Sequence, residues 1–167
     1  VAPGELVITE MMDGGYWGEK WIEVYNSSWQ HLNLRGVVIS HSSWDWMEVI
    51  ADDLWLDAGD HLVLNRGDHV PFEGPGPDSW DAVVLFVPGP GGLIDGVGFV
   101  GQVKEGQSFS LSSDEYDSWA NDYELSWCGA VPTPGEHNRS CASQFCGVED
   151  LEYLLETTDG YGNVRSS

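Results

Sequence analysis

The sequence predicts an all-β protein built as an antiparallel β-sandwich. The 167 residues include 21 glycines and 8 prolines, and helical periods are few, a composition typical of many short strands joined by turns. Roughly eight short apolar runs alternate with turn signals, the spacing expected of a sandwich. No unit repeats at a fixed period, which argues against a propeller or a solenoid.

The best-patterned strand covers residues 21–26, where Ile22 and Val24 point to one face and Trp21, Glu23 and Tyr25 to the other. The turn formers after Tyr25 end this strand, and we expect its second face to cover the sheet from outside. An earlier strand is predicted over residues 5–11.

Later segments repeat the same short, turn-bounded pattern. Residues 68–81 contain three prolines and predict a loop, while residues 88–92 predict a hairpin-like connection. Residues 108–111 alternate and predict an edge strand. The remaining predicted strands are residues 37–40, 44–49, 61–65, 82–87, 93–99 and 125–127.

The chain divides into a sandwich domain over residues 1–140 and a C-terminal extension over residues 141–167. In the extension, apolar residues at near-helical spacing predict one short amphipathic helix over residues 148–156, followed by a polar tail.

The three cysteines are Cys128, Cys141 and Cys146, and their spacing matches no zinc or thioredoxin pattern. A Cys128–Cys141 disulfide would close a loop near a length that contributes ~3 kcal/mol by chain entropy. Cys146 would then keep a free thiol, although a Cys128–Cys146 pair is the alternative. A disulfide indicates an oxidising compartment.

Charge excludes several partners. Twenty-eight acidic residues against six basic ones give a formal net charge of −22, which repels nucleic acid and anionic membranes. No stretch approaches the ~20 apolar residues that a membrane span needs, so we expect no membrane insertion. The composition suits a secreted protein, and the expected location is extracellular or at the cell surface.

Seven segments in order resemble the lamin-tail domain in its secreted bacterial form. Two departures are local: Val37 stands where the family often has Trp, and Ala58 stands where Pro is usual. The matching segments are LVITEM at 6–11, WIEVYN at 21–26, LRGV at 34–37, LDAGDHLVL at 56–64, IDGVGF at 94–99, GQS at 106–108 and TPGEHN at 133–138.

This resemblance implies an immunoglobulin-like sandwich of antiparallel strands that serves as a non-catalytic accessory module of extracellular proteins. It also implies a structural role for carboxylates such as Glu10 and Glu23, which would accept backbone or hydroxyl hydrogen bonds. Residues 141–167 lie outside the resemblance.

Few residues suggest catalysis, metal binding or modification. Glu10 and Glu23 can lie on neighbouring strands, and paired carboxylates can perform hydrolysis, although we expect no enzyme here. The five histidines are scattered, and no Gly-x-Ser-x-Gly elbow occurs. Asp57 and Asp60, with other acidic residues nearby, are candidate calcium ligands, and no other cofactor is expected. Asn26 and Asn138 each begin a formal glycosylation sequon.

Tryptophan is abundant, with nine in the chain. Trp44 and Trp46, two apart, would share one face, and Trp80 lies in the predicted loop. Such side chains can stack on sugars or anchor a protein, or they can simply cover the sandwich and its open ends.

The sequence therefore predicts a structural or interaction module whose partner is a protein, either further copies of itself or neighbouring domains. Contacts through sheet edges and the C-terminal tail are expected. The alternative is a carbohydrate-binding module that uses Trp44, Trp46 and Trp80.

Overall fold

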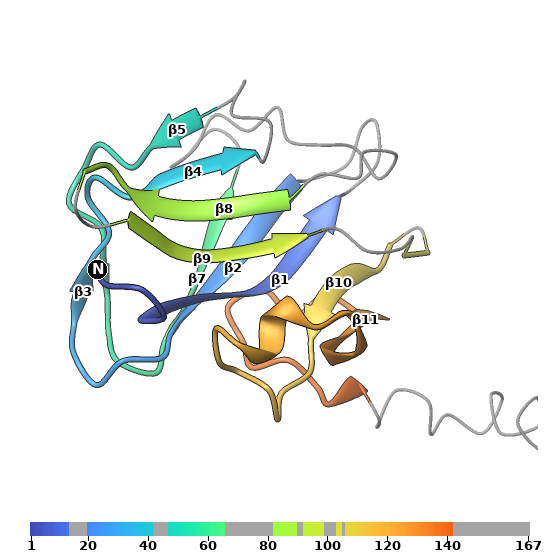
Figure 1. The fold of residues 1–167 in the computed structure, drawn as a ribbon. Helices are drawn as coiled ribbons and strands as arrows, with labels where there is room; N and C mark the ends of the chain where they lie inside the picture. The colour runs from blue at the N-terminus through green and yellow to red at the C-terminus, as the bar shows by residue number, and fades with distance from the viewer. Residues whose placement is uncertain are drawn as a thin grey trace, which may run out of the picture.

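Two antiparallel sheets face each other in the computed structural model, which describes residues 1–13, 20–41, 47–65, 82–89, 92–98, 103–104 and 106–141 (Figure 1). The five-stranded sheet has the order β11-β10-β1-β2-β7, and the four-stranded sheet has the order β5-β4-β8-β9. The predicted antiparallel β-sandwich is confirmed. The strands of the first sheet are β11 (Trp127–Ala130), β10 (Ser108–Leu111), β1 (Leu6–Asp13), β2 (Lys20–Asn26) and β7 (His61–Asn65), and those of the second are β5 (Met47–Val49), β4 (Val38–His41), β8 (Ala82–Val87) and β9 (Gly92–Gly98).

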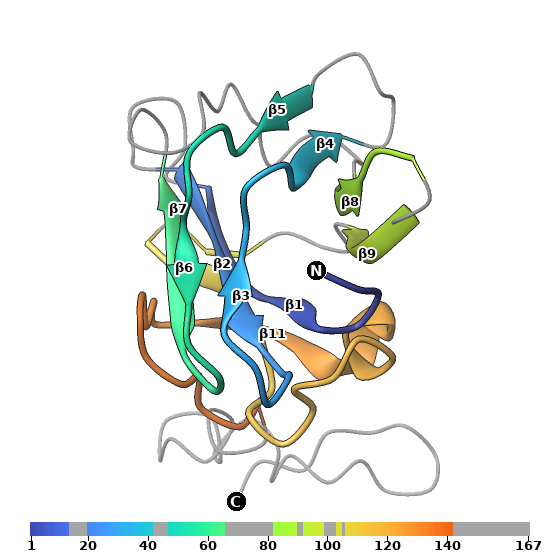
Figure 2. The same ribbon diagram turned by 90° about the vertical axis from the view of Figure 1, so that its left-hand side faces the viewer.

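Smaller elements complete the described fold. β3 (Leu32–Asn33) pairs with β6 (Trp55–Leu56) beside one end of the sandwich (Figure 2). The 3₁₀ turns η1 (Ala120–Asp122) and η2 (Glu124–Ser126) lie between β10 and β11. No helix within the described residues is long and apolar enough to cross a membrane.

Two strand predictions are wrong in an instructive way. β10 is an interior strand because β11 pairs with it on the side opposite β1. Leu125 was predicted to open the last strand, yet it lies in η2 with its side chain exposed, and the strand begins at Trp127. The predicted loop over residues 68–81 and the helix over residues 148–156 lie outside the described residues.

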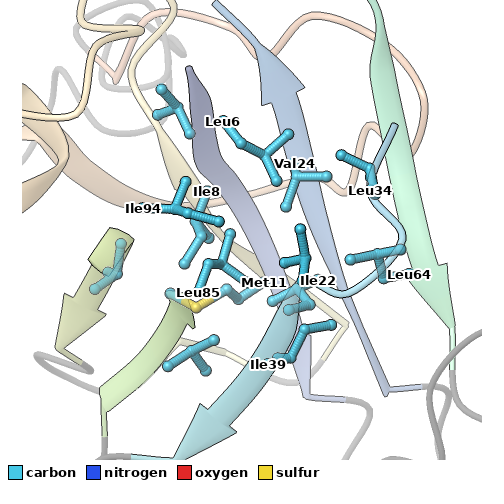
Figure 3. Packing of buried hydrophobic residues seen from close by; sticks show 14 of the residues in the cluster. Leu6, Ile8, Met11, Ile22, Val24, Leu34, Ile39, Leu64, Leu85 and Ile94 are labelled. Atoms are coloured by element: carbon cyan, nitrogen blue, oxygen red, sulfur yellow. The ribbon is translucent and has the colours of Figure 1, made fainter. Parts of the chain in front are cut away.

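The core lies between the sheets. Ile8, Ile22 and Val24 project from β1 and β2 toward Ile39 and Leu85 of the four-stranded sheet (Figure 3). Each such side chain is almost fully buried, and burial of one contributes roughly 1.5–3 kcal/mol. Strict alternation places Ile22 and Val24 on one face of β2, as its sequence predicted.

A β-bulge at Thr9 sets the direction of the next side chain. The register of β1 against β2 runs Ile8↔Val24 and then Glu10↔Glu23, so Thr9 is the extra residue. Without the bulge, Ile8 and Glu10 would share a face, because side chains two apart in a strand do. The bulge leaves Ile8 in the core and turns Glu10 to the outer face, beside Glu23.

The outer face of the five-stranded sheet is covered by residues 131–141, which we call the strap. The strap follows β11 and is tied back to it by the Cys128–Cys141 disulfide, whose Cα atoms are 5.8 Å apart. The predicted pairing is therefore confirmed, and Cys146 lies outside the described residues. Because the strap covers it, Glu23 is buried rather than part of the outer cover that the alternation predicted, and Trp21 is buried as well.

Candidate functional site

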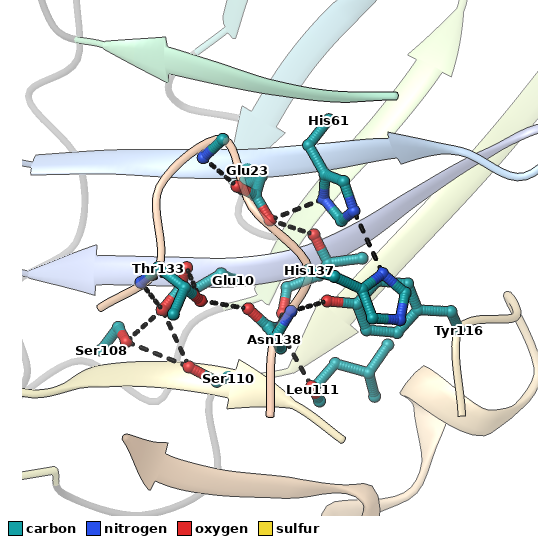
Figure 4. A network of polar contacts seen from close by, with 12 residues as sticks. Glu10, Glu23, His61, Ser108, Ser110, Leu111, Tyr116, Thr133, His137 and Asn138 are labelled. Carbon is teal, nitrogen blue, oxygen red and sulfur yellow. Dashed lines mark hydrogen bonds and ion pairs between the residues drawn. The ribbon is translucent and has the colours of Figure 1, made fainter. Parts of the chain in front are cut away.

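Glu10 and Glu23 are cross-strand neighbours beneath the strap, and both are fully buried (Figure 4). The Glu10 carboxylate accepts hydrogen bonds from the hydroxyls of Ser108 and Ser110, the second at 2.9 Å. From the strap, the Thr133 N–H donates to both Glu10 oxygens at 3.2 Å, and the Thr133 hydroxyl adds a contact at 3.3 Å. Glu10 therefore joins β1, β10 and the strap.

Glu23 holds the middle of the strap. Its Oε2 accepts the Gly135 N–H at 2.7 Å, and its Oε1 accepts the Thr9 hydroxyl at 2.9 Å. Residues 133–136 form a turn closed by the Glu136 N–H on the Thr133 carbonyl at 2.9 Å. Pro134 and Gly135, with Gly135 at φ 79°, occupy the central positions as in a type II turn. The turn thus points a free N–H at a buried carboxylate.

Asn138 fixes the far half of the strap. Its Nδ2 donates to the carbonyls of Thr9 at 2.7 Å and Leu111 at 3.0 Å, and its own N–H donates to the Tyr116 hydroxyl at 2.7 Å. Asn26, the other residue that begins a sequon, is likewise buried and donates to two carbonyls. Both sequon amides are therefore occupied inside the fold.

Aromatic rings surround the outer end of Glu23. The His61 Nδ1 lies 2.9 Å from Glu23 Oε1, and the His61 Nε2 lies 3.4 Å from His137 Nδ1. Tyr25 and Tyr116 flank both imidazoles, with ring centroids 4.9 Å apart for Tyr25 and His61 and 4.2 Å apart for Tyr116 and His137. The sequence had indicated only scattered histidines, because residues so far apart in the chain share no local pattern.

Burial dominates the electrostatics of this face. Desolvation raises the pKa of Glu10 above its usual value, against the lowering effect of its hydroxyl and amide donors, and the charge of Glu23 raises it further. Burial also raises the pKa of the Tyr116 hydroxyl. A hollow of about 40 Å³ beside Glu10 is lined by Ser110, Thr133 and Arg139, among others. Ligand pockets usually measure about 300–1,000 Å³, so this hollow has room for water.

A third buried carboxylate links the two sheets. Asp95 on β9 accepts the Ile8 N–H of β1 at 2.7 Å and the Asn121 Nδ2 at 2.7 Å. Desolvation raises the pKa of Asp95 to about 6, although these donors and the Gly96 N–H lower it. Asn121 also receives the Trp127 indole N–H on its carbonyl at 2.8 Å. The side chain of Asp95 therefore accepts a backbone N–H of β1 and joins the two sheets at this point.

The segment 117–125, which we call the apolar loop, is anchored at its base and apolar outside. The Asp117 carboxylate accepts the N–H groups of Trp119 and Ala120 at 2.8 Å each, and buried Asn121 ties the loop to Asp95. Three large side chains of the apolar loop project into solvent: Trp119 is 79% exposed, Tyr123 65% and Leu125 95%.

The sequence-predicted sites have separate outcomes. Trp44, Trp46 and Trp80 lie outside the described residues. Asp57 pairs with His31 at 2.6 Å, and its carbonyl accepts the Asp60 N–H at 3.1 Å. Over the described ranges, no three His, Cys, Asp or Glu side chains gather to hold a metal ion, so calcium at Asp57 and Asp60 stays a prediction.

Sequence reasoning named Glu10 and Glu23 as possible neighbours, and their cross-strand register confirms this. It missed the roles of Thr133, Gly135 and Asn138, although the segment TPGEHN carried the signal of a turn. Comparisons with protein-family models, with curated proteins and with solved structures find no match to this chain.

Proposed function

We propose that this chain is a non-catalytic extracellular interaction module of lamin-tail type, which binds another protein through the apolar loop. The exposure of Trp119, Tyr123 and Leu125 on an anchored segment carries the proposal. Trp and Tyr dominate the binding energy of protein interfaces, and a segment already held in one conformation loses little entropy on binding.

A non-catalytic role is supported by the use that the fold makes of its carboxylates. Glu10 and Glu23 are surrounded by donors from β1, β10 and the strap, and the hollow lined by Ser110 and Thr133 measures only about 40 Å³. A hydrolase that uses two carboxylates needs both of them to flank a bound substrate, as acid and as base or nucleophile. Here both serve as acceptors that hold the strap.

Charge favours a partner of a different kind from this chain. The exposed Asp114, Asp117 and Asp122 flank the apolar side chains, and the whole protein carries a net charge of −22. Two copies meeting at this loop would bring acidic groups together. The surface instead fits a protein that presents an apolar patch bordered by lysine or arginine.

Selection from a displayed random-peptide library tests this proposal. We expect enriched peptides with aromatic or aliphatic centres and basic flanks, and binding should fall at least about tenfold in the variant Trp119→Ser/Leu125→Ser. Trp55→Ser is the matched control, because Trp55 is 62% exposed but lies in the separate β3–β6 pair, and it should bind like wild type.

Two results would contradict a protein partner at the apolar loop. One is a selection that enriches no common sequence, and the other is equal binding by the loop variant. A glycan array read with the same variants supplies the third outcome. Glycan binding that disappears with Trp119→Ser would assign a carbohydrate ligand to the apolar loop and overturn the protein assignment.

Self-association is a second candidate, and β5 is the observation that favours it. β5 lies at the edge of the four-stranded sheet, and both Met47 and Val49 are exposed on it. An apolar edge strand can pair with a strand of a second copy, and the tail can add a strand to a neighbour's sheet. We expect light scattering to show a multimer that Met47→Lys or removal of residues 146–167 disperses. A monomeric wild type contradicts this candidate.

A further inference from the structure

The contact between His61 and His137 has no role in the proposed interaction. His61 projects from β7 and His137 from the strap, 76 positions apart in the chain, and their facing nitrogens are 3.4 Å apart. His61 is nearly buried, with 7% of its side chain exposed, whereas His137 is exposed to solvent. The pair therefore lies at the boundary between the covered face and water.

Glu23 determines which nitrogen of His61 carries hydrogen. Its carboxylate only accepts, so the His61 Nδ1 at 2.9 Å must be the N–H donor. The neutral imidazole then presents a lone pair at Nε2, toward His137 Nδ1. A histidine that donates its other N–H to a carboxylate is the usual arrangement around protein-bound zinc, because the carboxylate orients the ring and raises its basicity.

The nitrogen spacing agrees with the same arrangement. Hydrogen bonds from N–H to oxygen normally measure about 2.7–3.2 Å, so 3.4 Å between the two imidazole nitrogens is long for a hydrogen bond. Two imidazole nitrogens bound to one tetrahedral zinc ion, each at about 2.0–2.1 Å, lie roughly 3.3 Å apart. Calcium and magnesium take oxygen ligands, so a site that offers two nitrogens favours zinc over either.

We propose that His61 Nε2 and His137 Nδ1 bind one Zn²⁺ ion, with Glu23 as the positioning residue behind His61. Among the described residues no third His, Cys, Asp or Glu completes the set, so water or an external ligand takes the remaining positions. Zinc bound here joins the strap directly to β7. The site adds a metal-dependent fastening to a strap that hydrogen bonds and a disulfide already hold.

The test uses the full-length protein, ZnCl₂ as the probe and excess MgCl₂ to occupy the acidic surface. Long-range ¹H–¹⁵N spectra of the imidazoles should shift for His61 and His137 at one equivalent of Zn²⁺ and stay unchanged for His31. The thermal midpoint should rise with Zn²⁺, because a ligand that binds the folded state stabilises it. Zinc affinity should fall at least about tenfold in His137→Ala and about 10–100-fold in Glu23→Gln.

Matched variants separate this site from other zinc-binding groups. His31→Ala removes an exposed histidine that pairs with Asp57, and Cys146→Ser removes a thiol, so both should bind zinc like wild type. His137 is exposed, so its variant should fold, and an unchanged circular dichroism spectrum without zinc checks this. Wild-type affinity in His137→Ala, or imidazole signals that Zn²⁺ leaves in place, would overturn the proposal.

Discussion

Both faces of the five-stranded sheet contain fully buried side chains, which are stabilised by opposite means. On the inner face, Ile8, Ile22 and Val24 pack against hydrocarbon, where the gain follows apolar area and requires no particular direction. On the outer face, Glu10 and Glu23 are equally buried, and each depends on donors that point at its oxygens. A buried charge is stable only with such partners.

This difference shows how distant segments determine burial. One donor to the buried carboxylates of the outer face is Thr133, 123 positions from Glu10 in the chain. The inner face tolerates side chains of similar volume, whereas the outer face needs particular atoms in particular places. The inner face therefore stabilises the sandwich generally, and the outer face specifies where the strap lies.

The largest expected effect is on the inner face. Ile8→Ala should lower the free energy of unfolding by about 2–5 kcal/mol, because Ile8 is fully buried and its truncation leaves a cavity. Denaturant unfolding measures the change, and Ile8→Val is the control, with an expected loss of about 0.5–1.5 kcal/mol. A loss below 1 kcal/mol for the alanine variant would show that the inner face collapses around the change.

The next effect is expected from removing the disulfide of the outer face. Cys141→Ser opens the loop that ties the strap to β11 and should lower stability by about 3 kcal/mol. Reduced wild-type protein provides the matched comparison and should unfold at the same denaturant concentration as the variant. Equal stability of the oxidised protein and the variant contradicts the prediction.

Asp95 is a buried carboxylate that links the two sheets, so it tests how a carboxylate behaves outside the outer face. Its folded pKa of about 6 lies above the usual value of 3.8, so the folded state binds the proton more tightly than the unfolded state. Stability should therefore fall by up to about 3 kcal/mol as pH rises through that window and change no further from this group above it.

Asp95→Asn isolates the contribution of Asp95 from that of the acidic surface. The new amide keeps an acceptor for the Ile8 N–H, and the difference in unfolding free energy between variant and wild type should vary with pH only between about 4 and 6. Parallel stability curves for the two proteins across that range would refute the prediction.

The smallest expected effect comes from one hydroxyl of the strap. Thr133→Val removes the hydrogen bonds from Thr133 Oγ1 to Glu10 and to Asn138 but keeps the shape of the side chain, and should lower stability by about 1–2 kcal/mol. Thermal unfolding measures it. Thr133→Ser, which keeps the hydroxyl, should lose less than Thr133→Val, and the reverse order would show that packing rather than hydrogen bonding matters.

Local sequence patterns predicted where the strands begin and end. Pairing between segments distant in the chain determines which strands are neighbours and which way their side chains face. β7, β8 and β10 begin and end where alternation and turn formers indicated, because these signals lie within each segment. The interior position of β10 depends on β11, which no pattern around residue 108 encodes. The bulge at Thr9 likewise breaks the strict alternation from which the facing of Glu10 would be read.

The candidate site was predicted in part. The Glu10–Glu23 neighbourhood follows from two adjacent strands, and the Cys128–Cys141 pair follows from a short loop. The approach of His61 to His137 depends on the strap crossing the sheet, so periodicity does not reveal it. The apolar loop was also missed, since strand-like residues gave no indication that Leu125 would face solvent.

Native-state hydrogen exchange tests most directly whether the strap is an integral part of the fold. The amides of Thr133, Gly135, Asn138 and Cys141 donate to Glu10, Glu23, Tyr116 and Ser112, respectively. The fold described here predicts that these four amides exchange as slowly as those of β1, and that Glu23→Gln accelerates Gly135 most. Exchange of all four at the rate of an unstructured peptide, while β1 stays protected, would contradict it.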